Sequence, residues 1–117
     1  MGTKMPKIRN VTRGTTISST SIICKSIFRK ARGLMFSSQK TLIFEFSDER
    51  IIPLHMMFVF FPIEVLFVGR DKKVAEIKES FMPWSFYTPK KKACYVIELE
   101  SGLIRRSMTM VGDKLKF

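Results

Sequence analysis

An 18-residue apolar stretch limits the folds open to this chain more than any other feature of the sequence. Residues 51–68 read IIPLHMMFVFFPIEVLFV, which is long enough for a transmembrane helix. Pro53, Pro62 and Glu64 argue against a span, because lipid cannot replace the backbone hydrogen bonds that prolines remove and a charge at mid-membrane is costly. We therefore expect two consecutive buried strands with a break at Pro62, and no membrane span.

Most of the remaining chain has the pattern of short strands separated by turns. In the segment 94–100, Tyr95, Ile97 and Leu99 alternate with Glu98 and Glu100, which is the period of a strand. Strands are expected over residues 17–24, 41–46, 54–61, 64–68, 74–78, 94–100 and 114–117, with a hairpin turn at 69–73 and a loop at 81–92. This pattern predicts a mainly β fold, a small antiparallel β-sandwich or barrel-like domain.

One short helix is expected near the N-terminus, over residues 25–36. Its apolar residues recur at helical spacing, and Lys25, Arg29 and Arg32 fall together on another face. One or two further helical turns are expected within residues 103–110. Residues 1–16 show little periodicity and are expected to form a flexible basic arm, which leaves 17–117 as a single β domain.

The charge balance is the clearest functional signal. The 117 residues contain 21 Lys and Arg against 10 Asp and Glu, a net charge of +11. Two basic clusters stand out: Lys25, Arg29, Lys30 and Arg32 on the expected helix, and Lys90, Lys91 and Lys92 close to Trp84, Phe86 and Tyr87. Such clusters are either solvated faces or a surface for an anionic partner: single-stranded nucleic acid, an acidic protein, a lipid or an anionic ligand.

Few residues suit catalysis or metal binding. The chain has one histidine, His55, and two cysteines, Cys24 and Cys94, too far apart in sequence for a zinc motif. It has neither a glycine-rich phosphate loop nor a Gly-x-Ser-x-Gly motif. We expect no metal and no cofactor, and two reduced, buried thiols. No export signal is recognisable, which favours a cytoplasmic location.

Three acids, Glu64, Glu98 and Asp113, could form an acid/base site only if the fold brings them together. Glu98 and Glu100 would lie about 7 Å apart on one strand face, a spacing within the range of inverting glycosidases. Every Glu-x-Glu strand has this spacing, so a partly solvated strand face is the simpler interpretation.

Several short motifs occur in a distinctive order along the chain. They are Arg32-Gly33-Leu34-Met35, then His55-Met56 before Phe61-Pro62-Ile63-Glu64, then Pro83-Trp84, Val96-Ile97-Glu98-Leu99 with Gly102, and Gly112-Asp113. Over about residues 17–117 the chain thereby resembles the DUF 192 family, a domain of unknown function in archaea and bacteria, and its archaeal form most. The resemblance implies a small β-sandwich or barrel-like domain with a short helix, and it implies no activity. The family usually has Asp where this chain has Glu64.

These observations favour a non-enzymatic binding or accessory module with a basic surface. The expected ligand site is a cleft lined by His55, Trp84 and the Arg29 and Arg32 edge, with Glu64, Glu98 and Asp113 as further candidates. One alternative is binding of single-stranded nucleic acid or an anionic ligand. A second is a hydrolase that uses Glu64, Glu98 or Asp113.

Overall fold

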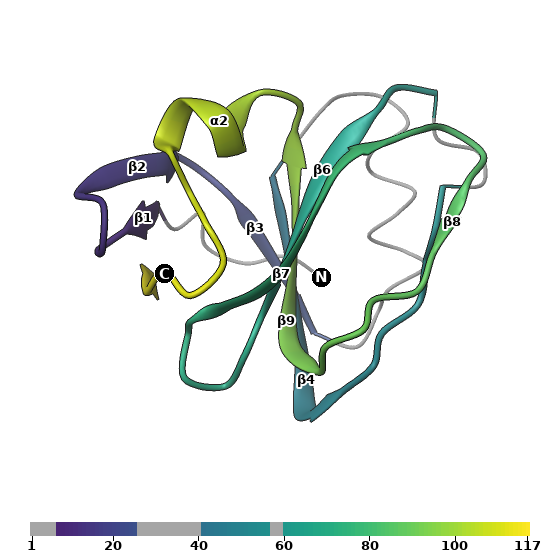
Figure 1. The fold of residues 1–117 in the computed structure, drawn as a ribbon, viewed down its shortest axis with the longest axis horizontal. Helices are drawn as coiled ribbons and strands as arrows, with labels where there is room; N and C mark the ends of the chain where they lie inside the picture. Colours follow the sequence, from purple (N-terminus) through teal and green to yellow (C-terminus); the bar gives the residue numbers. More distant parts are fainter. Residues whose placement is uncertain (1–6, 26–40, 57–59) are drawn as a thin grey trace.

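The computed structural model describes residues 7–25, 41–56 and 60–117. In these residues a central sheet is flanked by two smaller sheets and one short helix (Figure 1). In chain order the elements are β1 (Ile8–Asn10), β2 (Thr15–Ser18), β3 (Ile22–Lys25), β4 (Leu42–Arg50), β5 (Leu54–His55), β6 (Ile63–Val68), β7 (Val74–Phe81), β8 (Phe86–Tyr87), β9 (Ala93–Glu100), α2 (Leu103–Ser107) and β10 (Leu115–Lys116).

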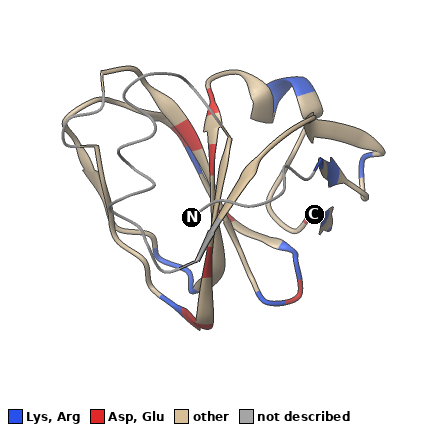
Figure 2. Cartoon of the chain, turned by 180° about the vertical axis from the view of Figure 1, so that it is seen from behind, with Lys and Arg blue, Asp and Glu red and all other residues tan. Residues whose placement is uncertain are grey.

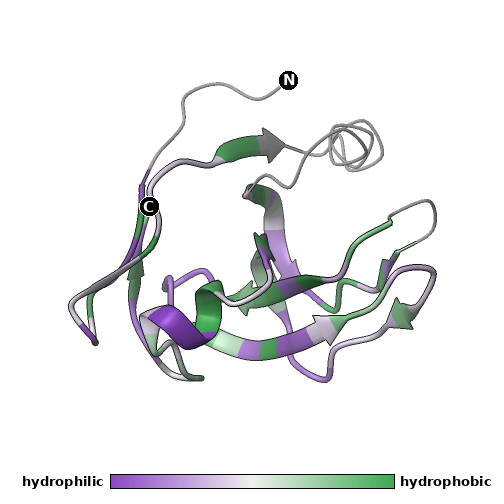
Figure 3. Cartoon of the chain, turned by 90° about the horizontal axis from the view of Figure 1, so that it is seen from above, coloured by the Kyte–Doolittle hydropathy of each residue, from purple (hydrophilic) through white to green (hydrophobic). Residues whose placement is uncertain are grey.

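The strands form three sheets in a layered arrangement. The central sheet has the order β3-β4-β9-β6-β7. A small sheet, β10-β1-β2, lies with α2 on one side of it, and the β5-β8 pair lies on the other (Figures 1 and 3). The mainly β, sandwich-like fold expected from the sequence is confirmed, and the sheets do not close into a barrel.

Two apolar clusters fill the spaces between the layers, one on each face of the central sheet. Alternate residues of β6 and β9 serve the two clusters: Val65, Phe67 and Val96 pack toward β5, whereas Leu66 and Ile97 pack toward β1, β2 and α2. Because both faces are covered, β6 is buried along its whole length. Truncation of Phe67, which is 0% exposed, to alanine is expected to cost about 3–5 kcal/mol.

Several local predictions are confirmed. Strand β6 begins at Ile63, directly after the predicted break at Pro62, and forms a hairpin with β7 around the 69–73 turn. The helix α2 lies within the predicted 103–110 segment. Separately from these predictions, no helix within the described part of the chain is both long enough and apolar enough to cross a membrane. Cys94 is a buried free thiol, as expected, and its Sγ donates to the Phe46 carbonyl at 3.0 Å.

The prediction of a flexible arm over residues 1–16 is wrong for residues 7–16, the part of this segment that the structure describes. Residues 8–10 and 15–16 belong to strands, and Ile8 is 0% exposed in the core. The reason is a long-range pairing: β1 lies between β2 and β10, so its hydrogen-bond partners include the other end of the chain. No local periodicity in residues 1–16 reports such a partner.

Three further expectations need correction or fall outside the structure. The β3–β4 pair is parallel, whereas an antiparallel sheet was expected throughout. The predicted strand 54–61 is formed only at Leu54–His55 among its described residues, and the predicted loop 81–92 contains strand β8, which pairs with it. The helix predicted over 25–36 lies outside the described residues, except for Lys25, which ends β3.

Candidate functional site

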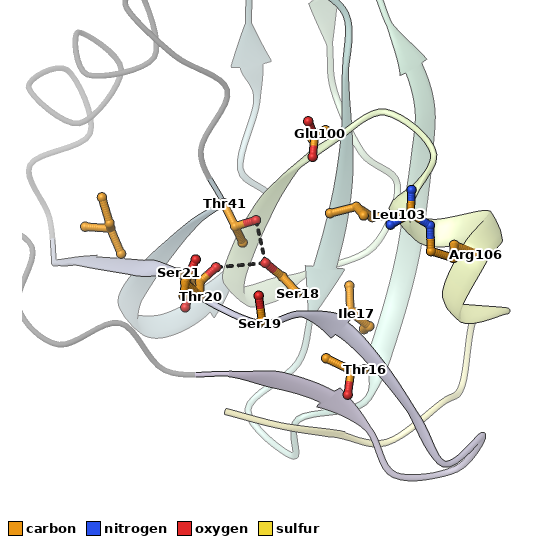
Figure 4. A pocket seen from close by; sticks show the side chains of 11 residues that line it. Thr16, Ile17, Ser18, Ser19, Thr20, Ser21, Thr41, Glu100, Leu103 and Arg106 are labelled. Atoms are coloured by element: carbon orange, nitrogen blue, oxygen red, sulfur yellow. Dashed lines mark hydrogen bonds between the residues drawn. The ribbon is translucent and has the colours of Figure 1, made fainter.

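A pocket of ≈ 540 Å³ opens between the β2–β3 segment and α2 (Figure 4). This volume lies within the range typical of small-molecule sites. The lining consists of Thr16, Ile17, Ser18, Ser19, Thr20, Ser21, Ile22, Thr41, Glu100, Leu103 and Arg106. Six of these residues carry a hydroxyl group, one is an acid and one carries a guanidinium, and the pocket surface is polar and apolar in comparable parts.

The hydroxyl wall is formed where the chain leaves the small sheet and enters the central one. Residues 19–21 make a bend between β2 and β3, and serine and threonine suit such a bend because their side chains bond to nearby backbone groups. The Ser18 hydroxyl donates to the Thr20 carbonyl at 2.8 Å and lies 2.9 Å from the Thr41 hydroxyl. These bonds fix the wall from within and connect it to the start of β4.

The opposite wall is supplied by α2 and the end of β9. Leu103 and Arg106 are three positions apart in α2, so they share one helical face, and Figure 4 shows both at the pocket. The Thr15 hydroxyl donates to the Ser107 carbonyl at 2.8 Å. This bond joins β2 to α2 and therefore holds the two walls of the pocket in a fixed relation.

Glu64 has a structural role in placing α2. Its Oε1 accepts a hydrogen bond of 3.0 Å from the backbone amide of Ile104, in the first turn of the helix. The residue before the helix is Gly102, which has a φ of 98° and no side chain to act as a cap. The Glu64 carboxylate, which lies on β6, therefore caps the N-terminus of α2 in place of a side chain from the preceding residue.

The charged groups of the pocket are Glu100 and Arg106, both exposed. Among the interactions of the described residues, neither side chain takes part in a salt bridge. A guanidinium can bind a carboxylate or phosphate through two parallel hydrogen bonds, and the hydroxyls can donate to or accept from a ligand. The arrangement suits the binding of a small polar molecule.

Reactive chemistry has less support at this pocket. The one histidine of the chain, His55, lies on β5, across the central sheet from the pocket, so it cannot activate any of the serine hydroxyls. Across residues 7–25, 41–56 and 60–117, no group of three or more His, Cys, Asp and Glu side chains could hold a metal ion.

The structure keeps the three candidate acids apart. Glu64 pairs in register with Leu99, whereas Glu98 pairs with Val65 and Leu42, so their side chains project from opposite faces of the central sheet. Glu98 is 0% exposed, which corrects the expectation of a partly solvated strand face. The cause is that both strands beside it present apolar residues on that face, which packs under β5.

Asp113 is the centre of a buried network instead. Its Oδ2 accepts hydrogen bonds from Asn10 Nδ2 at 2.9 Å, from Arg13 Nε at 3.0 Å and from the Met110 amide at 2.9 Å. Burial by itself raises the pKa of Asp113, but these hydrogen bonds and the Arg13 charge outweigh it and hold the pKa below its usual value. The network ties the β1–β2 turn to the C-terminal segment.

His55 and Trp84 do lie near each other, as the predicted cleft requires. His55 pairs with Phe86 across the β5–β8 ribbon, and the Trp84 amide donates to the Met56 carbonyl at 2.8 Å. Trp84 is 44% exposed and has a φ of 63°, an unusual value for a bulky residue. Arg29 and Arg32, the other edge of that cleft, lie outside the described residues, as do Lys30 and the side chain of Lys25 from the first basic cluster.

The second basic cluster is exposed and held by one acid. The backbone amides of Lys90 and Lys91 donate to Glu76 Oε1 at 2.8 and 2.9 Å, and the Tyr87 hydroxyl donates to Glu76 Oε2. Burial raises the pKa of Glu76, but these three bonds outweigh it and lower the pKa overall, while the same pairing raises the pKa of Tyr87 to about 12. Lys92 is also exposed.

The pocket is absent from the predictions made from the sequence. The available signal was the density of hydroxyl groups: six of the seven residues from Thr15 to Ser21 are serine or threonine. A strand needs no such density, so this excess pointed to a polar site. Nothing in the sequence connects the other wall, at Glu100 and Arg106, with residues 15–21.

Comparisons with known proteins agree with this fold. The DUF192 family model, described as an uncharacterized ACR, matches residues 9–117. A UPF0127 protein of Pyrococcus furiosus is 32% identical over 111 residues, covering 92% of this chain and 95% of that protein. A UPF0127 protein of Thermococcus sibiricus is 31% identical over 110 residues, covering 91% and 71%.

Two solved structures share the fold. One, from Sinorhizobium meliloti, is described as a candidate transcription regulator; it has a TM-score of 0.82 and 25% identity, and the match covers 97% of this chain and 95% of that one. The other, a protein of unknown function from Novosphingobium aromaticivorans, has a TM-score of 0.79 and 20% identity, with 100% and 93% covered. From the family match and the archaeal relatives together, this chain belongs to the uncharacterised DUF192 family, whose curated relatives carry the name UPF0127.

Proposed function

We propose that this protein is a non-enzymatic binding module whose pocket takes a small, hydroxylated anion, such as a sugar phosphate or a sugar acid. The observation that carries the proposal is the lining: six hydroxyls and one guanidinium around ≈ 540 Å³. Arg106 would bind the phosphate or carboxylate, and the hydroxyls of Ser19 and Thr20 would bind the polar remainder. Glu100 would accept a hydrogen bond from a ligand hydroxyl.

The charge around the pocket supports an anionic ligand. Arg105 neighbours Arg106 in α2, and the chain as a whole has a net charge of +11. A positive potential raises the local concentration of anions and their association rate. The cytoplasmic location inferred from the sequence stays a prediction and belongs to this proposal.

The test is a thermal-shift screen of sugar phosphates and sugar acids, followed by calorimetric titration of any that stabilise the protein. A ligand at about 100 times its Kd should add roughly 2.7 kcal/mol to the free energy of unfolding. Arg106→Gln should weaken binding at least about tenfold, since it removes a charge-assisted hydrogen bond.

Arg105→Gln is the matched control. It removes the same charge one position away, at a residue outside the lining, so its Kd should stay within about threefold of wild type. If none of the screened anions stabilises the protein, or if the two variants weaken binding equally, the proposed site is wrong.

A second candidate function, binding of single-stranded nucleic acid, is favoured by one observation. Phe60, Trp84 and Phe86 are 67%, 44% and 72% exposed, and Lys90–Lys92 follow in the same loop. Exposed aromatic rings stack on bases and lysines pair with phosphates. The description of the Sinorhizobium meliloti protein as a candidate transcription regulator agrees with a nucleic-acid partner.

The test is titration with single-stranded oligonucleotides at increasing salt. Binding should weaken steeply with salt, and Phe86→Ala should weaken it by about 1–3 kcal/mol. Exposed Met82, at 53%, gives a control, because Met82→Ala removes apolar surface beside the rings but no ring. If no binding occurs at low salt, this candidate is excluded.

A further inference from the structure

The outer face of the small sheet β10-β1-β2 is cationic. Ile8 and Asn10 are both 0% exposed and point into the molecule, so Arg9 between them points out. Arg9 pairs with Lys116 of β10 on one side and with Thr16 of β2 on the other, and its guanidinium donates to the Thr16 hydroxyl at 3.1 Å. A polar row of Lys116, Arg9 and Thr16, two of which are cations, therefore crosses this face.

The same charge extends over the whole lobe that the small sheet and α2 form, which we call the cationic lobe. Its residues are 7–23 and 101–117, and they contain a single acid, Asp113. Asp113 is 3% exposed and paired with Arg13, so it offers no negative charge at the surface. The cations of the lobe are Lys7, Arg9, Arg13, Arg105, Arg106, Lys114 and Lys116. Figure 2 shows lysine and arginine on α2 and around the C-terminus, whereas most acids lie on the central sheet and its turns.

Exposed aliphatic side chains accompany these cations. Val11, Met108, Met110 and Val111 are 54%, 59%, 57% and 60% exposed. Val11 lies in the turn after β1 and the others follow α2, and the two turns are tied together because the Val11 amide donates to the Lys114 carbonyl at 2.8 Å. The cationic lobe thus presents several exposed apolar side chains from neighbouring segments, together with its positive charges.

We propose that the cationic lobe docks on the anionic surface of a lipid bilayer. The charge is complementary to anionic headgroups, and the aliphatic side chains at the turns can enter the region between headgroups and acyl chains. A nucleic acid fits this lobe less well than a lipid surface. None of the exposed apolar side chains of the lobe is aromatic, so they offer no ring on which a base could stack. A face with this density of charge and no exposed aromatic ring is also unlike the centre of a protein interface. Docking of this kind needs no spanning helix.

The experiment is flotation of the full chain with vesicles of phosphatidylcholine alone and of phosphatidylcholine mixed with phosphatidylglycerol. Wild type should float with the mixed vesicles only, and less at high salt. The double variant Arg9→Gln, Lys116→Gln should bind roughly 30-fold more weakly, since each cation near the surface contributes about fivefold. Arg9→Lys, Lys116→Arg keeps both charges and should bind like wild type, which separates charge from damage to the fold.

Matched controls come from the opposite side of the molecule. Lys91→Gln, Lys92→Gln removes the same charge and should leave vesicle binding within about threefold. Met108→Ser, Val111→Ser should weaken binding several-fold, whereas Met82→Ser, Phe86→Ser should not. Both double serine variants remove exposed apolar side chains only.

Three results would overturn the proposal: no binding to mixed vesicles at low salt, equal binding to both kinds of vesicle, or equal losses in the lobe variants and in their controls. A fourth would reassign the lobe: if the Arg9, Lys116 variant loses binding to a single-stranded oligonucleotide while wild type ignores vesicles, the partner is nucleic acid. Arg106 is untouched in every variant here, so failure of this docking leaves the pocket proposal to its own test.

Discussion

Replacement of Asp113 by alanine should destabilise this protein more than its position two residues before the last strand implies. The carboxylate accepts three hydrogen bonds, from Asn10, Arg13 and the Met110 amide. Alanine removes the acceptor but leaves the donors in place. The bond from Asn10 is buried and the bond from the Met110 amide is part-buried, so hydration cannot fully replace either of them.

The size of the effect follows from the exposure of each donor. Loss of the acceptor should cost about 1–1.5 kcal/mol of unfolding free energy at the Met110 amide and the same at Asn10. The cost at Asn10 is no larger because its Nδ2 keeps a 3.0 Å hydrogen bond to Thr109. The Arg13 side chain is 37% exposed, so after solvent screening its pair with Asp113 adds only about 0.5 kcal/mol. The sum is about 3 kcal/mol, or a fall of roughly 12 °C in Tm for a domain of this size.

The measurement is urea unfolding followed by circular dichroism, with Asp48→Ala as control. Asp48 forms a salt bridge with Arg50 at 2.6 Å, but its side chain is 65% exposed, so its loss should not change the unfolding midpoint measurably. If Asp113→Ala unfolds at the same urea concentration as the control, the buried network contributes nothing and our reasoning about it is wrong.

Three further predictions concern neighbouring features. Because the pKa of Asp113 is lowered on folding, its contribution to stability is complete above the ordinary Asp value of about 4 and is lost as pH falls through the folded value; urea midpoints of wild type should therefore fall faster in acid than those of Asp113→Asn. Glu64→Ala should cost about 1–2 kcal/mol by removing the cap of α2, whereas Glu64→Gln, which keeps an acceptor, should recover most of it; equal urea midpoints for the two variants would exclude the capping role. Absorbance titration should show a tyrosine with a pKa of about 12, and this component should vanish in Tyr87→Phe; its persistence would assign it to Tyr95 instead.

The parts of the fold that depend on neighbouring residues could be predicted from the sequence. The Pro62 break and the 69–73 hairpin each have a local cause: a proline that cannot donate a hydrogen bond, and a polar turn between apolar runs. The family motifs also gave the fold class correctly, because their order reflects the whole domain.

The parts that depend on distant partners could not be predicted. Strand β1 has only three residues, and what makes it a strand is β10 at the other end of the chain. The pocket has the same difficulty, since Thr16, Thr41 and Arg106 come from three separate segments. The candidate acids show the converse error: Glu64 and Glu98 are both suitable types, but the register of β6 and β9 sends them to opposite faces.

The pairing of β1 with β10 also sets the order of events during synthesis. The Asn10–Asp113 bond joins residues 103 positions apart. At 5–20 residues per second, a ribosome takes roughly 5–20 s to make that length of chain. Throughout this interval Ile8, which is 0% exposed once folded, has no partner strand on its β10 side. The nascent chain therefore exposes an unpaired edge at β1 until β10 has been synthesised, and this is the stage at which a chaperone would have most to protect.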